Sequence, residues 1–536
     1  MDAIIIADTS SESVSATNKL KLTVDGHIAS IQNVTNFVQN NGRLVLPVPG
    51  EGVSSWASSM KLNGIFLYSY LSGKGFDLGL IDSYFEQRER FVEMLKESPR
   101  TVIISTTFIM SKKALHQLVR DIRTLAPDIF IVAGGQFVHL SNRIRERLKS
   151  DNPLMDIYSS DYLFLDEEDE PEVDLYIISS RGEAILASAL SIIKTHGKCE
   201  SLPNTATYLN KMYNFGNQTD DIIEKGAVTV DWQRVPADVF KSGVIPMQAS
   251  YGCPYRCSFC NFMKDRRLMG VKPVETLIEE LQTVEEKGVR YVWFADDNFR
   301  LGRNDLADVC KRFVEHGIST KWKSFIRASA LKTLDMDLLK AAGCIELQFG
   351  LESADPAILE AMNKEANPEL YSEVIERAMR AGINCSGYFI FGFPGETATS
   401  VIRTCEFIKS LEHPALDGYI SFSLFPFIIA PLSPISEVNN ARKYGLEGYM
   451  SKWKHNTMNS KEAREHAMQV FGSIEYSGLI FNADNLDMLM RLTPPDRKAF
   501  IAARHRLTKL SVRENLSEEY KFREFAKVLR DPVRTE

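Results

Sequence analysis

The chain has 536 residues, of which 44% are hydrophobic and 25% are charged, and its formal net charge is −7. This length allows about two to four domains with cores of their own. The acidic balance argues against broad electrostatic binding of nucleic acid, which needs a basic face, and favours a small-molecule or peptide substrate. The first eight residues, MDAIIIAD, lack the basic residues of a signal peptide, and their apolar run is too short for a membrane span. We therefore expect a cytoplasmic protein without a membrane partner.

Short apolar runs alternate with amphipathic helical stretches between residues 60 and 200, which is typical of a doubly wound parallel sheet. Strands are expected at 76–81, 101–105, 129–132 and 175–178, and helices at 64–72, 112–125 and 183–194. Residues 1–200 are thus predicted to form a Rossmann-like α/β domain. Such sheets bind ligands at the carboxyl ends of their strands. The candidate binding residues at those ends are Ser105, Thr106, Gly134, Gly135 and Gly182.

Two segments near this domain carry no strong periodicity. The acidic stretch at 166–174 is expected to be a solvated loop, because its like charges repel one another. Residues 201–243 are predicted to be a linker.

A second alternating series covers residues 244–434. Strands are expected at 246–250, 289–295, 321–327, 345–350, 385–391 and 418–425, with helices at 276–287, 305–316 and 368–381 between them. Right-handed crossovers would roll six such units into a partial (β/α)6 barrel, whose functional groups lie at the carboxyl edge of the strands.

Residues 435–536 are predicted to be mainly helical. Asn459 and Glu462 have the spacing of a capping box, which predicts a helix from Ser460 to Gly472. Trp453 and His455 precede it and are interpreted as a hydrophobic staple and cap, with a substrate lid as the alternative.

Cys253, Cys257 and Cys260 stand close together in the run YGCPYRCSFCN. Three thiolates on one loop can hold three irons of a cubane cluster and leave the fourth iron open to another ligand. A closed zinc site normally brings four ligands. The nearest further cysteine, Cys310, falls far downstream in a predicted helix. The pattern therefore favours a 4Fe–4S cluster over a zinc knuckle or three unrelated thiols.

The C-x-x-x-C-x-x-C spacing, with the aromatic Phe259 before the last cysteine, resembles the signature of the radical S-adenosylmethionine (SAM) enzymes. The resemblance implies that the open iron binds the amino and carboxylate groups of SAM. An electron from the cluster would then cleave SAM to a 5′-deoxyadenosyl radical. It also implies an external electron donor such as flavodoxin or ferredoxin.

Polar groups and glycines at the later strand ends resemble the SAM-binding strand ends of that family. A carboxylate near the sulfonium gains from the opposite charge, and backbone at a glycine can approach a ligand closely. An alternative for one pair is that Arg327 binds Glu352 merely to hold the barrel open. The resemblance implies that SAM contacts Phe259, Asp296, Asp297, Arg327, Glu352, Ile390 and Gly392.

The N-terminal domain is similar in outline to the cobalamin-binding domain of one branch of this family. The similarity runs through the segments NGIFLYSYL (63–71), VIISTT (102–107), VAGGQFVH (132–139) and RGEAIL (181–186), and in total covers about residues 40–435. It implies that cobalamin is held near the strand-end glycines and hydroxyls named above. The D-x-H-x-x-G signature of classical cobalamin domains is absent, and His139 is not assigned as a cobalt ligand.

The resemblance implies a cobalamin-dependent radical SAM methyltransferase that methylates an unactivated carbon of a small-molecule or peptide substrate, in specialised metabolism. One SAM would methylate reduced cobalt, and a second would give the radical that removes a substrate hydrogen atom. No protein residue is assigned as a catalytic acid, base or radical carrier. The alternatives are a radical SAM cyclase or rearrangement enzyme without methyl transfer, and a non-catalytic iron–sulfur sensor. A methylthiotransferase would need three further cysteines in its N-terminal domain, and no cysteine precedes Cys199.

Overall fold

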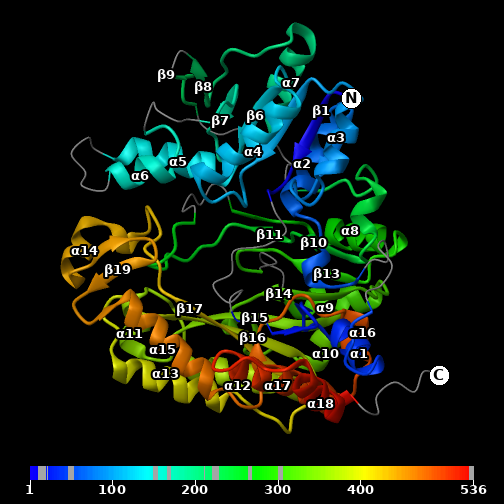
Figure 1. Cartoon of the computed structure of the whole chain (residues 1–536), viewed down its shortest axis with the longest axis vertical. Coiled ribbons are helices and arrows are strands. Elements are labelled where there is room, and N and C mark those ends of the chain that lie inside the picture. The colour runs from blue at the N-terminus through cyan, green and yellow to red at the C-terminus, as the bar shows by residue number, and fades with distance from the viewer. Residues whose placement is uncertain are drawn as a thin grey trace. The chain divides into compact units, whose positions relative to one another are not determined.

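The chain forms two compact units, each built on one seven-stranded sheet (Figure 1). The first unit contains residues 1–13 and 60–239, and the second contains 14–59 and 240–536. The predicted domain boundaries differ from this division, because residues 14–59 belong to the second unit. The computed structural model describes residues 1–9, 20, 22–45, 53–148, 155–165, 171–209, 212–219, 229–262, 269–299 and 306–529.

The sheet of the first unit has the strand order β4-β1-β5-β6-β7-β8-β9. Five strands are parallel: β1 (Ala3–Ile6), β4 (Leu78–Ile81), β5 (Thr101–Ser105), β6 (Phe130–Gly134) and β7 (Leu175–Ile177). Counted along the chain they lie in the order 2-1-3-4-5, which is a common doubly wound order. The predicted Rossmann-like fold is therefore confirmed. β1 is a central strand that was not predicted.

The remaining two strands correct the predicted linker. β8 (Thr205–Leu209) and β9 (Met212–Phe215) extend the same sheet by antiparallel pairing. Residues 201–243 are thus partly strand. Most of the acidic stretch at 166–174 lies outside the described residues.

The helices of the first unit follow its parallel strands along the chain. α4 (Lys112–Leu125) begins where the Ser111 hydroxyl accepts a hydrogen bond from the Ala114 N–H, and it buries Leu115, Leu118 and Ile122 at helical spacing. The other helices are α2 (Leu62–Gly73), α3 (Arg88–Leu95), α5 (Gln136–Arg147), α6 (Met155–Asp161) and α7 (Glu183–His196).

The sheet of the second unit is entirely parallel, in the order β10-β13-β14-β15-β16-β17-β21. It contains the six predicted strands and a seventh from the C-terminal region. The predicted partial barrel is confirmed. The bounds are β10 (Val244–Met247), β13 (Tyr291–Phe294), β14 (Lys321–Phe325), β15 (Cys344–Glu352), β16 (Asn384–Phe391), β17 (Ile420–Pro426) and β21 (Gly478–Leu479).

Helices alternate with these strands, and fully buried side chains such as Trp322, Phe349 and Phe389 belong to the core of this unit. α12 (Pro368–Arg380) begins at Asn367, whose side chain accepts a hydrogen bond from the Leu370 N–H, and proline occupies its first turn. The other helices between the strands are α8 (Val274–Glu286), α9 (Leu306–Glu315), α10 (Met336–Ala341), α11 (Pro356–Ala361) and α13 (Ala398–Ser410).

The C-terminal region is mainly helical, as predicted, but it also holds a small antiparallel sheet. The helices are α14 (Val438–Tyr444), α15 (Ser460–Ser473), α16 (Leu486–Arg491), α17 (Pro494–Ser511) and α18 (Glu518–Leu529). The predicted capping box of α15 is present. The small sheet consists of β18 (Glu447–Tyr449), β19 (Lys452–His455) and β20 (Met458–Asn459).

Trp453 and His455 belong to β19, so their interpretation as a helix staple and cap is wrong. Trp453 Nε1 donates to the Phe427 carbonyl at 2.7 Å, and His455 Nε2 lies 3.1 Å from the Gly392 carbonyl. Both side chains therefore fix β19 to the carboxyl ends of β16 and β17.

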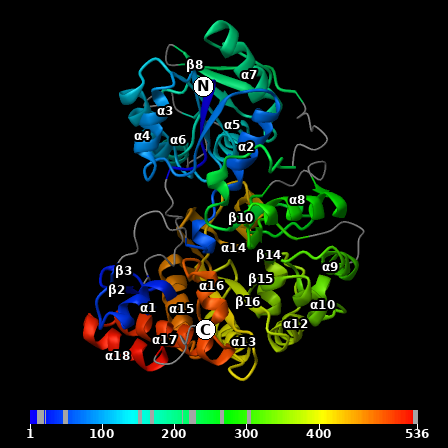
Figure 2. The same cartoon turned by 90° about the vertical axis from the view of Figure 1, so that its right-hand side faces the viewer.

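The N-terminal segment of the second unit packs on its C-terminal helices. Figure 2 shows α1 (Ile31–Gln39), in blue, beside α17 and α18, in red. Phe37 of α1 shares a hydrophobic cluster with Phe500 and Phe525. The antiparallel strands β2 (Thr23–Val24) and β3 (His27–Ile28) precede α1. Among the described residues, no helix is both long and apolar enough to cross a membrane.

Candidate functional site

The three cysteines line one cavity of about 760 Å³ in the second unit. Their loop follows β10 and the short strand β11 (Ser250–Tyr251), which pairs with β12 (Gly270–Val271). Burial raises the pKa of Cys257 and Cys260 above the ordinary thiol value. Both groups would ionise readily only beside a cation, such as a bound iron.

The three cysteines are not arranged around a single metal ion. In the described part of the chain, no three His, Cys, Asp or Glu side chains are placed to hold one metal ion. A zinc knuckle needs such convergence, whereas each thiolate of a cubane binds a different iron. None of the other five cysteines lines this cavity. The three thiols are thus consistent with a cluster that keeps one iron open.

Backbone contacts fix the cysteine loop to later parts of the second unit. The Ser258 N–H donates to the Met362 carbonyl at 2.7 Å, and the Ile435 N–H donates to the Ser258 carbonyl at 2.9 Å. The Asn363 side chain donates to the Arg256 carbonyl at 2.8 Å. The loop is therefore held between the end of α11 and the segment that follows β17.

The paired carboxylates Asp296 and Asp297 hold the start of the same loop. The buried Asp296 carboxylate accepts from the Ala249 N–H at 2.9 Å and from the Ser250 N–H at 3.0 Å. Burial raises the pKa of Asp296 to about 7. Asp297 accepts from the Gly252 N–H at 2.9 Å and lines the cavity, whereas Asp296 does not. Asp296 thus positions the start of the loop without lining the cavity.

Glu352 lies on the cavity wall and forms an ion pair that was not predicted. Its Oε1 is 2.8 Å from Lys364 Nζ, and the two side chains are only 10% and 9% exposed. Burial alone would lower the pKa of Lys364, but the Glu352 charge raises it. Glu352 also has φ +63°, and the β15–β16 register shifts between Gly350 and Glu352. Such backbone strain is typical of functional sites.

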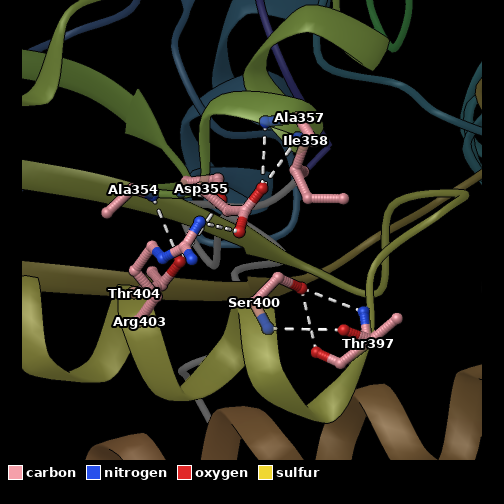
Figure 3. Close-up of polar contacts among 9 residues, drawn as sticks. Ala354, Asp355, Ala357, Ile358, Thr397, Ser400, Arg403 and Thr404 are labelled. Carbon is pink, nitrogen blue, oxygen red and sulfur yellow. Dashed lines mark hydrogen bonds and ion pairs between the residues drawn. The ribbon is translucent and has the colours of Figure 1, made fainter.

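A polar network fixes the segment that follows Glu352. Figure 3 shows the Asp355 carboxylate between the first turn of α11 and Arg403 of α13. Asp355 accepts from the Ala357 N–H at 2.9 Å and pairs with Arg403 at 2.6 Å. Thr404 Oγ1 accepts from the Ala354 N–H at 3.1 Å. α13 itself begins with a capping box between Thr397 and Ser400. These contacts tie α13 to the strained strand end.

Arg327 lines the cavity, but it does not pair with Glu352. Its Nη1 donates to the Glu365 carbonyl at 2.7 Å, and its guanidinium carbon lies 3.2 Å from the centroid of the Tyr255 ring. Its Nη2 is 3.9 Å from Cys257 Sγ. The alternative in which Arg327 pairs with Glu352 to hold the barrel open is therefore wrong, because the partner of Glu352 is Lys364.

Of the three remaining residues predicted to bind SAM, two line the cavity and one has a packing role outside it. Phe259 and Ile390 line the cavity. Gly392 does not: it has φ +86°, and a Cβ there would lie 2.5 Å from both Trp453 and Ala463. Its N–H donates to the fully buried Glu396. Gly392 is thus required where β19 and α15 pack against β16. No motif in the sequence marks Lys364 or Tyr388, which also line the cavity.

A second cavity, of about 220 Å³, lies at the strand ends of the first unit. It is lined by four of the five predicted residues, Ser105, Gly134, Gly135 and Gly182. Thr106 does not line it, because it is fully buried and its hydroxyl donates to the Gly134 carbonyl at 3.0 Å.

Asn63, which was not predicted, lines the same cavity. Its Nδ2 donates to the Ala7 carbonyl and to Ser105 Oγ, both at 2.8 Å, whereas its buried Oδ1 has no partner among the described residues. His139 also lines the cavity, and its Nδ1 lies 3.0 Å from the Ile178 carbonyl. Hydroxyls, glycines and a spare acceptor suit a ligand with amide or hydroxyl donors.

Residues 247–408 match the model of the radical SAM superfamily. The chain is 31% identical over 234 residues to an uncharacterized methyltransferase of Pyrococcus horikoshii. The matched region covers 42% of this chain and 50% of that protein. It is 23% identical over 409 residues to the anaerobic magnesium-protoporphyrin IX monomethyl ester cyclase of Cereibacter sphaeroides, covering 70% of this chain and 62% of that protein. The chain thus spans about half to three fifths of these relatives.

Two solved structures share the fold over almost the whole chain. The cobalamin-dependent SAM radical enzyme OxsB, with aqua-cobalamin and SAM bound, has a TM-score of 0.61 at 14% identity, covering 99% of this chain and 75% of that chain. The radical SAM methyltransferase TsrM of Kitasatospora setae, with tryptophan and a SAM analogue bound, has a TM-score of 0.58 at 14% identity, covering 99% of both chains.

Proposed function

Since residues 247–408 of this chain form a radical SAM domain, we propose that the chain is a cobalamin-dependent radical SAM methyltransferase. The substrate carbon would be one that ordinary nucleophilic methylation cannot reach. The substrate would be a small molecule or a peptide, a proposal that agrees with the tryptophan bound to TsrM.

The observation that carries this proposal is the single cavity that brings Cys253, Cys257 and Cys260 together with Glu352 and Arg327. The cysteines would hold the cluster, which supplies the electron for SAM cleavage. The Glu352 carboxylate would attract the positive charges of SAM. Arg327, 3.9 Å from Cys257 Sγ, would stabilise the negative charge on that thiolate. Phe259, Asp297 and Ile390 complete the proposed SAM-binding set on this cavity.

Part of the cobalamin would lie in the strand-end cavity of the first unit, which at about 220 Å³ is smaller than the whole cofactor, and the cofactor would supply the methyl carrier. Ser105 and Asn63 offer polar groups there, and Gly134, Gly135 and Gly182 line it without side chains. The unpartnered Asn63 Oδ1 would accept from an amide of the corrin periphery. We further propose an external electron donor such as flavodoxin or ferredoxin, and a cytoplasmic location.

A second candidate is radical cyclisation or rearrangement without methyl transfer. It is favoured by the match to the cyclase of Cereibacter sphaeroides, which covers 70% of this chain. This candidate uses the same cysteine-lined cavity and differs in the fate of SAM.

The two candidates differ in the products that they form from SAM. Protein produced with cobalamin supplied would be reduced anaerobically and incubated with SAM. We expect equimolar corrin by absorbance, and both S-adenosylhomocysteine and 5′-deoxyadenosine. 5′-Deoxyadenosine alone would favour the cyclase, and neither product would contradict both candidates.

Gly135→Val provides a control for the first-unit cavity. Gly135 has φ +112°, and a Cβ there would lie 3.1 Å from the Thr106 nitrogen. The variant should lose corrin and S-adenosylhomocysteine but keep its iron, because the cysteines belong to the other unit. Equal corrin in both proteins would contradict the proposed cobalamin site.

A further inference from the structure

One wall of the cysteine-lined cavity consists of aromatic side chains from three strands of the parallel sheet. Phe325 of β14, Tyr388 of β16 and Phe425 of β17 line the cavity, and we call them the aromatic wall. The ring centroids of Tyr388 and Phe325 are 4.9 Å apart, and the planes of Tyr388 and Phe425 differ by only 7°. The wall is half-buried, whereas most residues of these three strands are buried. It thus offers apolar ring surface to whatever fills the cavity.

The charged residues that line this cavity already have partners within the protein. Glu352 and Lys364 pair with each other at 2.8 Å, Arg327 donates to the Glu365 carbonyl, and Asp297 accepts from the Gly252 N–H. The polar contact that the wall itself can offer is the Tyr388 hydroxyl.

A partly buried hydrogen-bond network next to the wall sets the direction of that hydroxyl. Glu346 accepts from Ser386 Oγ at 2.8 Å and from Gln348 Nε2 at 3.4 Å. The same Nε2 donates to the Tyr388 oxygen at 3.1 Å. The amide cannot be reversed, because its oxygen would then face the Glu346 carboxylate. The Tyr388 oxygen is therefore an acceptor toward Gln348, and its own hydrogen has no acceptor among the described residues.

The same network selects the kind of acceptor that Tyr388 can serve. Burial and the charge of Glu346 raise the pKa of Tyr388, so the phenol stays protonated and remains a donor. The half-buried Glu346 carboxylate would repel an anionic group on the ligand. An uncharged carbonyl oxygen is therefore the acceptor that this position favours.

We propose that the aromatic wall is the substrate subsite, and that it takes a planar aromatic or conjugated ring whose uncharged carbonyl oxygen accepts a hydrogen bond from Tyr388. This inference rests on the proposed function, because it assumes that SAM fills the part of the cavity beside the cysteines. Tyr388 is then a specificity-determining residue. The adenine ring of SAM is the other planar group that could lie on this wall, and the experiment must separate the two.

Three probes of similar size test the ring and the carbonyl separately. They are 2-acetylnaphthalene, 2-isopropylnaphthalene without the carbonyl, and 2-acetyldecalin without the aromatic ring. Binding to anaerobically reconstituted full-length protein would be measured by ligand-observed NMR in saturating S-adenosylhomocysteine, which occupies the cofactor position. We expect 2-acetylnaphthalene to bind about tenfold more tightly than either other probe.

Tyr388→Phe should remove the advantage of the ketone over the hydrocarbon while keeping the iron content and SAM binding. Tyr476→Phe, at a tyrosine that is 54% exposed, is the matched control and should behave as the wild type does. Equal affinity for the three probes, a ketone advantage that survives in Tyr388→Phe, or no binding at all would overturn the proposal. Loss of probe binding on adding S-adenosylhomocysteine would assign the wall to adenine instead.

Failure of the proposed function would be visible separately. A protein that binds the aromatic ketone but forms no 5′-deoxyadenosine would refute radical SAM chemistry and leave the subsite intact. A protein that cleaves SAM but shows no ketone preference would refute the subsite alone.

Discussion

Glu352 Oε1 and Lys364 Nζ lie 2.8 Å apart on the wall of the cavity that the three cysteines also line. Both side chains are about nine-tenths buried, so each charge depends on the other for the interactions it loses from water. Glu352 is itself the strained residue, with φ +63°, at the end of β15. A change to either residue should therefore affect both the stability of the barrel and the geometry of the candidate site.

Lys364→Met should destabilise the protein by about 3–5 kcal/mol, because it leaves the Glu352 carboxylate buried without a partner. Guanidinium unfolding under anaerobic conditions measures this loss. The double variant Glu352→Gln, Lys364→Met should recover much of it. Lys454→Met removes an exposed ion pair with Glu447 and is the matched control, expected to cost less than about 1 kcal/mol. A Lys364→Met loss no larger than that of the control would contradict the account.

Glu352→Gln should weaken SAM binding by about tenfold or more without changing the iron content, because the charge attraction is lost while the cysteines are untouched. Equilibrium dialysis with radiolabelled SAM and a parallel iron assay measure the two quantities. Unchanged affinity would assign Glu352 to the barrel scaffold alone.

Thr404→Val tests the network that holds the segment after Glu352 (Figure 3). The replacement keeps the side-chain shape but leaves the buried Ala354 N–H without its acceptor, which should cost about 1–3 kcal/mol. Arg403→Gln removes the neighbouring ion pair of a half-exposed side chain and should cost less than about 1 kcal/mol. Thermal unfolding compares the two variants, and the reverse order of losses would contradict the role given to Thr404.

Stability should fall as the pH rises from about 5 to about 7, in part because of Glu396. Burial raises the pKa of this fully buried carboxyl from 4.5 to about 7. In that window the folded protein binds more protons than the unfolded chain, so raising the pH favours unfolding. Below about pH 4.5 both states are protonated, and above about pH 7 the full penalty, about 3 kcal/mol, is present.

Glu396→Gln should flatten this pH dependence, since a neutral amide can still accept from the Gly392 N–H. A residual slope is expected from Asp296, whose pKa burial also raises to about 7. Urea unfolding across the pH range measures both proteins. Identical slopes for the two proteins would show that Glu396 does not titrate as described.

Local signals in the sequence predicted most of the elements. The helix at 112–125 and the strand at 101–105 have the predicted bounds, because a serine cap and an apolar run mark them. The capping box of α15 was likewise predicted from Asn459 and Glu462. These features depend on neighbours within a few residues, which a sequence displays directly.

The structural features that the sequence did not predict correctly depend on contacts between residues far apart in the chain. β1 is only four residues long, and nothing in that run shows that it pairs with both β4 and β5. The docking of α1 depends on Asp484, which accepts from the Ile31 N–H across 453 residues of chain. Gly392 and Asp296 were predicted as SAM contacts from their motifs, yet neither lines the cavity, because their partners come from β19, α15 and the cysteine loop.

The most direct test of the central claim is the formation of 5′-deoxyadenosine from SAM by the anaerobically reconstituted and reduced protein. We expect about four irons per chain and steady formation of this product. The variant Cys253→Ala, Cys257→Ala, Cys260→Ala should keep its fold but bind no cluster and form none. Formation of 5′-deoxyadenosine at the wild-type rate by the triple variant would contradict the claim that these three cysteines carry the chemistry.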